Sequence, residues 1–278
     1  MRQRTTLVAL ISITALVGVL SLAAVAADYG NEPRVLDSRA LPFAPIDERG
    51  KLVFADSFED SPSDQFGGSL GAWATSIDGD GGRIVRTGAQ ANTGLHSLLL
   101  EPPTTPLKRT QISKQIPLFL PNVTRVGLEV SIKPTHALQI GDEIGVYLFV
   151  FDGSFYHYFA VRYVHAALPS IDYRNIDGTW SAIWIGSLTD APTLFFPVKI
   201  VADVTTDEYV RAVVMGREFD LTGIPIQKVA ALESGGHANI NIDAWAGTAN
   251  FSSGFYVDDV KVTAAEPEAS SPTLPAVP

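Results

Sequence analysis

The sequence predicts an all-β protein in which two antiparallel sheets pack face to face as a β-sandwich. Apolar residues recur at every second position or in short runs, and Gly, Pro, Asn and Asp interrupt these runs. Between residues 50 and 264 the sequence shows no convincing helical periodicity. About a dozen short strands with turns between them favour a sandwich over an α/β fold.

The expected strands follow this alternation, and the turn between two of them is marked clearly. Asp152-Gly153 separates two aromatic-rich strands, and this dipeptide is a strong signal for a tight hairpin. The strands are expected at residues 52–56, 83–86, 97–100, 126–133, 143–151, 155–163, 181–185, 198–203, 209–215, 240–245 and 255–262.

The first 27 residues have the layout of a secretory signal peptide. Arg2 and Arg4 precede an apolar run over residues 7–19, and small residues follow up to Ala27. The alternative is an uncleaved anchor, because an apolar run of about 20 residues can span a bilayer. In both cases the remainder faces the outside, so we expect a secreted or cell-surface protein.

The remaining chain divides by composition into an arm, one domain and a tail. Residues 28–49 are polar and contain several prolines, which predicts an extended N-terminal arm. Residues 50–264 hold the expected strands and form a single β-sandwich domain, since large sandwiches often exceed 200 residues. Residues 265–278 are rich in Pro, Ser and Ala, which predicts a disordered tail.

Charge and cysteine content exclude several functions. The formal net charge is −10, and such a surface repels phosphate backbones and anionic lipids. We therefore expect no nucleic-acid partner, and membrane contact only through an uncleaved N-terminal segment. The chain contains no Cys, so thiolate nucleophiles, Cys-based metal sites and disulfides are excluded, and the fold must depend on its apolar core.

Residues 194–221 give the clearest local pattern. Val198, Ile200 and Ala202 alternate with residues of the opposite face, a polar turn follows at 205–207, and a second strand leads to a turn at Gly216. This pattern indicates a meander with one buried face.

The meander resembles the concanavalin A-like and laminin-G-like β-sandwiches, which are jelly rolls. Three further segments are similar to the opening, turn and closing segments of secreted carbohydrate-binding modules: FADSFED at 54–60, TGLHSLLL at 93–100 and FYVDDVKV at 255–262. Trp73 lies between the first two. The resemblance covers most of residues 51–263 at the level of patterns, and proteins with different ligands share such patterns. It implies that the first and last strands pair and that the protein binds a polysaccharide or cell-surface glycan.

The resemblance also implies a structural Ca²⁺ ion at one end of the sandwich. The expected ligands are the carboxylates of Asp56, Glu59 and Asp259, with backbone oxygens of Thr93 and Gly94. Ca²⁺ takes six to eight oxygen ligands, which such a set supplies if these segments are neighbours. The alternative is that these acidic residues cap turns and solvate a sheet edge.

Aromatic residues are dense between residues 149 and 184 and suggest a glycan platform. Sugar rings stack on aromatic rings, and their hydroxyl groups require polar neighbours. Alternation places Tyr156, Tyr158 and Arg162 on one face of their strand, and His157 and Tyr163 on the other. The candidate ligand-binding residues are Tyr156, Tyr158, Arg162, Tyr173, Trp180 and Trp184. The alternative is that many of these aromatic residues fill the core.

The sequence gives little support for catalysis. Concanavalin-like glucanases carry E-x-D-x-x-E on one strand, and this motif is absent. The five His residues lack the H-x-x-x-H and H-x-H spacings of zinc sites. His157 or His165 could act as a base with Tyr156 or Tyr163 as acid, as in some polysaccharide lyases. The alternative is that each is an isolated core or surface histidine.

These observations predict a secreted or cell-surface, non-catalytic, lectin-like module that binds polysaccharide or a cell-surface glycan. Two alternatives remain: a lyase-like enzyme that acts on polysaccharide, and a structural or adhesion protein that binds other surface proteins. Structural Ca²⁺ is the only cofactor expected.

Overall fold

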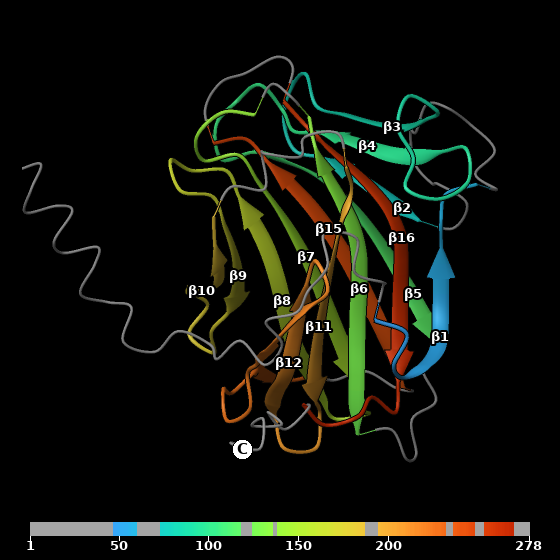
Figure 1. Cartoon of the computed structure of the whole chain (residues 1–278), viewed down its shortest axis with the longest axis vertical. Coiled ribbons are helices and arrows are strands. Elements are labelled where there is room, and N and C mark those ends of the chain that lie inside the picture. The colour runs from blue at the N-terminus through green and yellow to red at the C-terminus, as the bar shows by residue number, and fades with distance from the viewer. Residues whose placement is uncertain are drawn as a thin grey trace, which may run out of the picture. The chain divides into compact units, whose positions relative to one another are not determined.

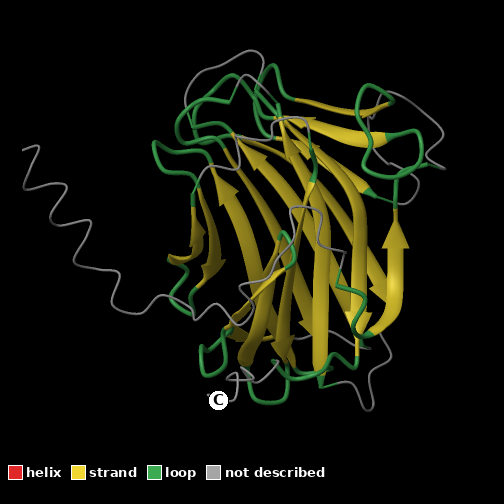
Figure 2. Cartoon of the chain, viewed as in Figure 1, coloured by secondary structure: helices red, strands yellow, loops and turns green. Residues whose placement is uncertain are grey.

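The computed structural model of the chain describes residues 47–59, 73–117, 124–135, 138–186, 194–231, 236–247 and 253–269. All of them belong to one compact unit, Arg34–Pro278. Within these ranges every regular element is a strand, and sixteen strands form two antiparallel eight-stranded sheets (Figures 1 and 2). The predicted all-β, two-sheet antiparallel sandwich is confirmed.

The expected leader, residues 1–27, lies outside the described ranges, as do most of the arm and the end of the tail. Among the described residues, no helix is long and apolar enough to cross a membrane.

The first sheet has the strand order β13-β12-β11-β6-β16-β4-β3, and β1 pairs with β16 beside β4. The bounds are β1 (Lys51–Asp56), β3 (Arg83–Thr87), β4 (Ser97–Glu101), β6 (Arg125–Pro134), β11 (Phe196–Asp203), β12 (Glu208–Val214), β13 (Arg217–Asp220) and β16 (Phe255–Ala264). Figure 1 shows β6, β11 and β16 as long neighbouring strands, with β3 and β4 beyond them.

The second sheet has the order β10-β9-β8-β7-β15-β5-β2, and β14 pairs with the first half of β8. The bounds are β2 (Ala74–Ile77), β5 (Arg109–Pro117), β7 (Glu143–Phe151), β8 (Phe155–Val164), β9 (Ser170–Arg174), β10 (Trp180–Ile185), β14 (Gln227–Ala230) and β15 (His237–Trp245). β7, β8 and β15 form its centre.

The core lies between the two sheets and consists of alternate residues of their central strands. The buried residues of β6 and β7 illustrate the pattern: Val126, Leu128, Val130, Ile132, Ile144, Val146, Leu148 and Val150. Burial of each such side chain contributes roughly 1.5–3 kcal/mol. This apolar layer therefore stabilises the domain without any disulfide.

The first and last strands of the domain pair, as the resemblance implied. β1 and β16 are antiparallel, with Lys51 opposite Ala264 and Asp56 opposite Val260. Trp73 closes this end of the core, because its Nε1 donates to Asp56 at 2.8 Å while its ring lies 5.9 Å from that of Phe58.

A β-bulge in β16 changes the direction of two acidic side chains. The pairing with β6 shifts between Asp258 and Lys261, and Asp259 has a φ of 48°, which Asp tolerates better than most residues. As a result both adjacent carboxylates contact the loop at Asn92 and Thr93, whereas regular alternation would place them on opposite faces.

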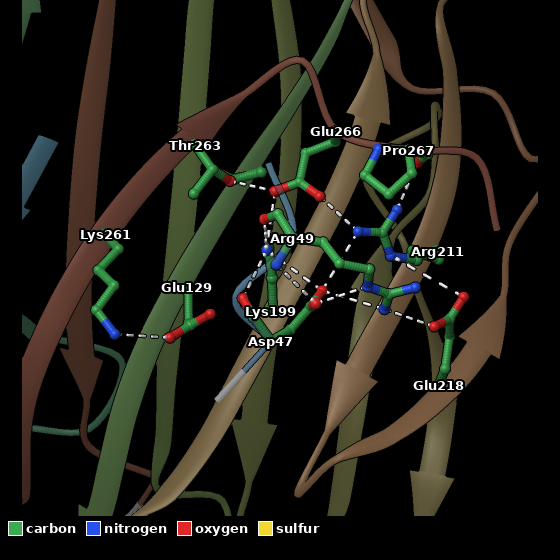
Figure 3. A network of polar contacts seen from close by, with 11 residues as sticks. Asp47, Arg49, Glu129, Lys199, Arg211, Glu218, Lys261, Thr263, Glu266 and Pro267 are labelled. Carbon is green, nitrogen blue, oxygen red and sulfur yellow. Dashed lines mark hydrogen bonds and ion pairs between the residues drawn. The ribbon is translucent and has the colours of Figure 1, made fainter. Parts of the chain in front are cut away.

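A buried ionic cluster covers part of the outer face of the first sheet (Figure 3). It joins residues of β11, β12 and β13 to the segments that flank the domain, and consists of Asp47, Arg49, Lys199, Arg211, Glu218 and Glu266. Glu266 lies within 2.8 Å of Lys199 and also pairs with Arg211. The Lys199 and Arg211 side chains are at most 1% exposed.

Backbone contacts complete this cluster. Lys199 Nζ donates to the carbonyl oxygens of Asp47 and Arg49, and Arg211 donates to that of Pro267 at 2.6 Å. Burial raises the Asp47 pKa, but the hydrogen bond from Arg49 and the charges of Lys199 and Arg211 outweigh it and hold that pKa far below its ordinary value. Asp47 and Glu266, which the sequence placed in the arm and the tail, are thus fixed on the first sheet.

Candidate functional site

The outer face of the second sheet carries a concentration of polar and aromatic side chains. On β15 the apolar residues Ala238, Ile240, Ile242 and Ala244 are buried between the sheets. Alternation therefore places the other residues of β15 on the outer face: His237, Asn239, Asn241, Asp243 and Trp245. The neighbouring strands β7 and β8 add aromatic rings to this face.

These rings form one continuous set of stacked and edge-to-face contacts across β7, β8 and β10. Phe149 and Tyr158 are cross-strand neighbours, and their rings are parallel to within 9° at 4.4 Å between centroids. The ring centroid of Tyr147 lies 6.0 Å from that of Tyr158 and 6.2 Å from that of Trp180 on β10. We call Tyr147, Phe149, Tyr156, Tyr158 and Trp180 the aromatic platform.

Three arginines lie beside the platform, and two of them are paired with carboxylates. Arg162 donates to Asp172 at 3.0 Å and to Glu143 at 2.8 Å, and its guanidinium lies 4.5 Å from the Trp180 ring. Arg109 donates to Asp243 at 2.7 Å. The third, Arg174, stacks on Tyr158 at 4.9 Å.

A groove of about 570 Å³ lies next to the platform. Its lining residues come from β2, β5, β7, β8 and β15: Ala74, Ser113, Lys114, Gln115, Phe149, Tyr156, Asn239 and Asn241. Amide and hydroxyl groups thus lie next to two aromatic rings. This combination suits a ligand with many hydroxyl groups and an apolar face, which is the chemistry of a sugar ring.

Burial controls the protonation of the polar groups on this face. It raises the pKa of Tyr158 to about 12 and raises that of Tyr147 still further. The same effect raises the pKa of Glu143 and of Asp243, although Arg162 and Arg109 oppose it. At neutral pH both phenols are therefore neutral and can donate or accept hydrogen bonds.

Four of the six predicted ligand-binding residues lie together on this face. Tyr156, Tyr158 and Arg162 alternate with the core residues of β8 as predicted, and Trp180 joins them from β10. Tyr173 and Trp184 lie elsewhere. Tyr173 is a core residue with its ring 5.5 Å from that of Tyr209, and Trp184 packs against the core after a register shift in β10.

The amide side of the groove is not apparent from the sequence pattern. The residues of β5, RTQISKQIP, are mostly polar and do not predict a strand, so the pattern gives no signal for Ser113 and Gln115. β15 was expected in part, from residue 240. The regular polar–apolar alternation of HANINIDAW at 237–245 was the available signal for Asn239 and Asn241.

The predicted calcium residues lie on neighbouring segments but bind separate partners. Asp56 accepts hydrogen bonds from Phe58 and Trp73, and Glu59 accepts from the backbone of Leu95 and His96. Asp259 accepts from the Thr93 hydroxyl at 2.6 Å. Gly94 adjoins Glu59, since a Cβ atom on it would lie 2.4 Å from that carboxylate.

Among the described residues, no group of three or more His, Asp or Glu side chains is arranged to hold a metal ion. Calcium at Asp56, Glu59, Thr93, Gly94 and Asp259 stays a prediction.

The histidines considered as catalytic bases occupy structural positions. His157 is 1% exposed and lies between two carboxylates, with Nδ1 2.8 Å from Asp207 and Nε2 3.0 Å from Asp152. His165 lies 3.2 Å from the Tyr163 hydroxyl, which belongs to the core.

A different histidine, His237, has its Nε2 3.1 Å from the hydroxyl of Tyr156, and Tyr156 lines the groove. Residues 67–71, GGSLG, match the G-x-S-x-G spacing of a serine nucleophile but lie outside the described ranges.

Comparisons with known proteins establish the fold. The sequence matches no protein-family model and no curated protein. The structure is similar to that of a cellulose-induced protein, Cip1, with a TM-score of 0.52 and 13% identity over 78% of this chain and all of that one. At this identity the likeness shows a shared β-sandwich fold and nothing about activity.

Two further solved structures have lower scores. A carbohydrate esterase from the Shiga toxin-encoding bacteriophage phi24B gives a TM-score of 0.49 at 14% identity, covering 78% of this chain and 100% of that chain. Lectin II from Ulex europaeus gives 0.45 at 9% identity, covering 77% of this chain and 99% of that one. These scores are too low to support an argument.

Proposed function

We propose that this protein is a secreted or cell-surface, lectin-like module that binds polysaccharide or a cell-surface glycan without catalysis. The observation that carries the proposal is the groove of about 570 Å³ on the second sheet, where the amides of Asn239 and Asn241 adjoin the rings of Phe149 and Tyr156. The ionic cluster covers part of the outer face of the first sheet, whereas the groove lies on the outer face of the second sheet. The fold shared with Cip1 is compatible with this role.

A glycan array with the full-length chain tests this proposal. We expect binding to a defined set of glycans, which Asn241→Ala weakens, because the variant removes one amide from the groove without touching the core. Lys108→Gln is the control, since Lys108 makes an exposed ion pair with Asp78 outside the groove. Absence of binding to every glycan, with self-association or capture of a surface protein instead, would favour the adhesion alternative.

The Tyr156–His237 pair supports a lyase-like enzyme as the second candidate. In a β-elimination one group removes the proton next to the carboxyl of a uronic acid residue, and another protonates the departing glycosidic oxygen. The Tyr156 side chain, which lines the groove, and the His237 imidazole in contact with its hydroxyl suit these two roles. Release of unsaturated uronate, abolished by Tyr156→Phe and by His237→Gln, would establish catalysis. Binding with no product would support the non-catalytic module.

We further propose that Asp259 is the central ligand of a structural Ca²⁺ ion at one end of the sandwich. Within the described parts of the chain, neither Asp258 nor Asp259 forms an ion pair with Lys or Arg, and burial raises the Asp258 pKa to about 6. A divalent cation would compensate these charges. The expected result is a Tm higher in CaCl₂ than in EDTA, with the difference lost in Asp259→Asn. Equal Tm values would overturn the prediction.

A further inference from the structure

Arg174 differs from the other arginines beside the aromatic platform. It follows Tyr173 at the end of β9 and lies directly opposite Trp180 of β10. Its guanidinium lies 4.9 Å from the Tyr158 ring and 5.6 Å from the Trp180 ring. Among the described residues it forms no ion pair, and its buried Nε finds no hydrogen-bond acceptor.

Arg162 and Arg109, unlike Arg174, are paired with carboxylates. Each of these two has one or two carboxylates within 3.0 Å. The two acidic residues nearest to Arg174 in sequence bind other partners. Asp172 accepts from Arg162 at 3.0 Å, and Asp177 accepts from the backbone N–H and hydroxyl of Thr179 at 2.9 and 2.6 Å. The hydrogen bonds from Thr179 hold the pKa of Asp177 below its ordinary value, and the charge of Arg174 adds to this effect. No carboxylate among the described residues forms an ion pair with Arg174, so part of its donor set is available to a ligand.

An aromatic ring contacts the flat face of a guanidinium, whereas the N–H donors of the guanidinium point outward in its plane. Stacking therefore positions the group and leaves its N–H donors available. A planar group held in this way can form two parallel hydrogen bonds to a carboxylate or a sulfate. Gly178 lies on another side, since a Cβ atom there would approach Arg174 Nη2 to 3.1 Å. The rings and the turn at Gly178 together pre-organise the side chain.

A series of ring contacts connects Arg174 to the groove. Phe149 lines the groove and stacks on Tyr158, and Tyr158 in turn stacks on Arg174. The path from Asn239 on β15 to Arg174 on β9 crosses β7 and β8, a distance of about 14 Å for three strand spacings. A glycan lying across the strands would thus place different sugar residues at the amides and at Arg174.

We propose that Arg174 forms an anion subsite of the glycan site, which binds the carboxylate of a uronic acid residue or a sulfate ester. This inference rests on the proposed glycan-binding function and adds the class of ligand. The net charge of −10 acts against an anionic ligand over long distances, but salt screens such interactions beyond about 10 Å at 0.1 M. The local guanidinium then determines which groups bind beside it.

The test compares matched acidic and neutral glycans with the full-length chain. Oligogalacturonate and its methyl ester differ in the carboxylate, which the ester neutralises with a methyl group, and dextran sulfate and dextran differ in the sulfate. We expect at least one acidic member to bind more tightly than its neutral twin. Arg174→Gln should weaken that binding roughly tenfold or more, since charge-assisted hydrogen bonds are strong. Arg174→Lys should restore part of it, and Lys108→Gln should leave it unchanged.

The outcomes separate this inference from the function on which it rests. If the wild-type chain binds no glycan on the array or in these pairs, the proposed function fails together with the subsite. If it binds glycans but does not distinguish the twins, or if Arg174→Gln binds the acidic member as tightly as wild type, only the anion subsite is overturned. Preference within the oligogalacturonate pair identifies a carboxylate ligand, and preference within the dextran pair identifies a sulfate.

Discussion

Phe149 and Tyr158 lie directly opposite each other on β7 and β8, with their rings stacked 4.4 Å apart. Phe149 lines the groove, whereas Tyr158 contacts Tyr147 and Arg174. This cross-strand pair therefore connects the amide side of the site to its arginine side.

Replacement of Tyr158 should interrupt that connection. We expect Tyr158→Ala to weaken glycan binding about tenfold, or about 1.4 kcal/mol, because the ring that contacts Phe149, Tyr147 and Arg174 is lost. Tyr158→Phe should retain most of the affinity if stacking dominates over the hydroxyl. Isothermal titration with a glycan identified on the array measures both. An unchanged affinity in Tyr158→Ala, with an unchanged far-UV spectrum, would place the ligand elsewhere.

The ionic cluster on the first sheet should be sensitive to the loss of one partner. Glu266→Ala leaves the buried Lys199 and Arg211 without their shared carboxylate, and removal of one member of a buried pair costs about 3–5 kcal/mol. Urea unfolding should show this loss. Asp78→Ala removes an exposed partner of Lys108 and should cost at most about 1 kcal/mol. Equal effects of the two variants would contradict the burial of the cluster.

Asp258 should make stability depend on pH in a defined direction. Burial raises its pKa from 3.8 to about 6, so the folded protein binds this proton more tightly than the unfolded chain does. The resulting destabilisation is absent below about pH 4 and complete above about pH 6.

The comparison with Asp258→Asn isolates this group. Between pH 4 and pH 8, the free energy of unfolding of the variant should rise relative to wild type by roughly 3 kcal/mol. If the free energies of unfolding of wild type and Asp258→Asn change with pH in parallel in calcium-free buffer, the pKa of Asp258 is not raised and the prediction is contradicted.

His157 should contribute to stability and not to ligand binding. His157→Ala leaves Asp152 and Asp207 without their shared partner and opens a cavity, so we expect a loss of about 2–4 kcal/mol in urea unfolding. Binding measured well below the Tm should match wild type, because His157 faces the core. His165→Gln is the comparison, with a smaller expected loss. A folded His157→Ala variant with impaired binding would contradict this assignment.

Alternation was enough to predict one face of the site. Residues 155–163 have a period of two, so Tyr156, Tyr158 and Arg162 had to share a side of any strand that buries Phe159 and Val161. Trp184, which was predicted as an aromatic residue near this face, packs against the core instead, because a register shift in β10 turns its side chain. Alternation also gave no strand at β5, where polar residues dominate.

The sequence by itself determined the all-β class, the pairing of the first and last strands and the candidate face of β8, since these follow from local periodicity and segment resemblance. Only the tertiary structure decided which strands lie beside β8. It brought Asn239, Asn241 and Arg174 to the aromatic platform, and it turned Asp258 and Asp259 to one side through a bulge. The physical reason is that sheet order and register depend on contacts between residues far apart in the chain, which a periodic pattern does not encode.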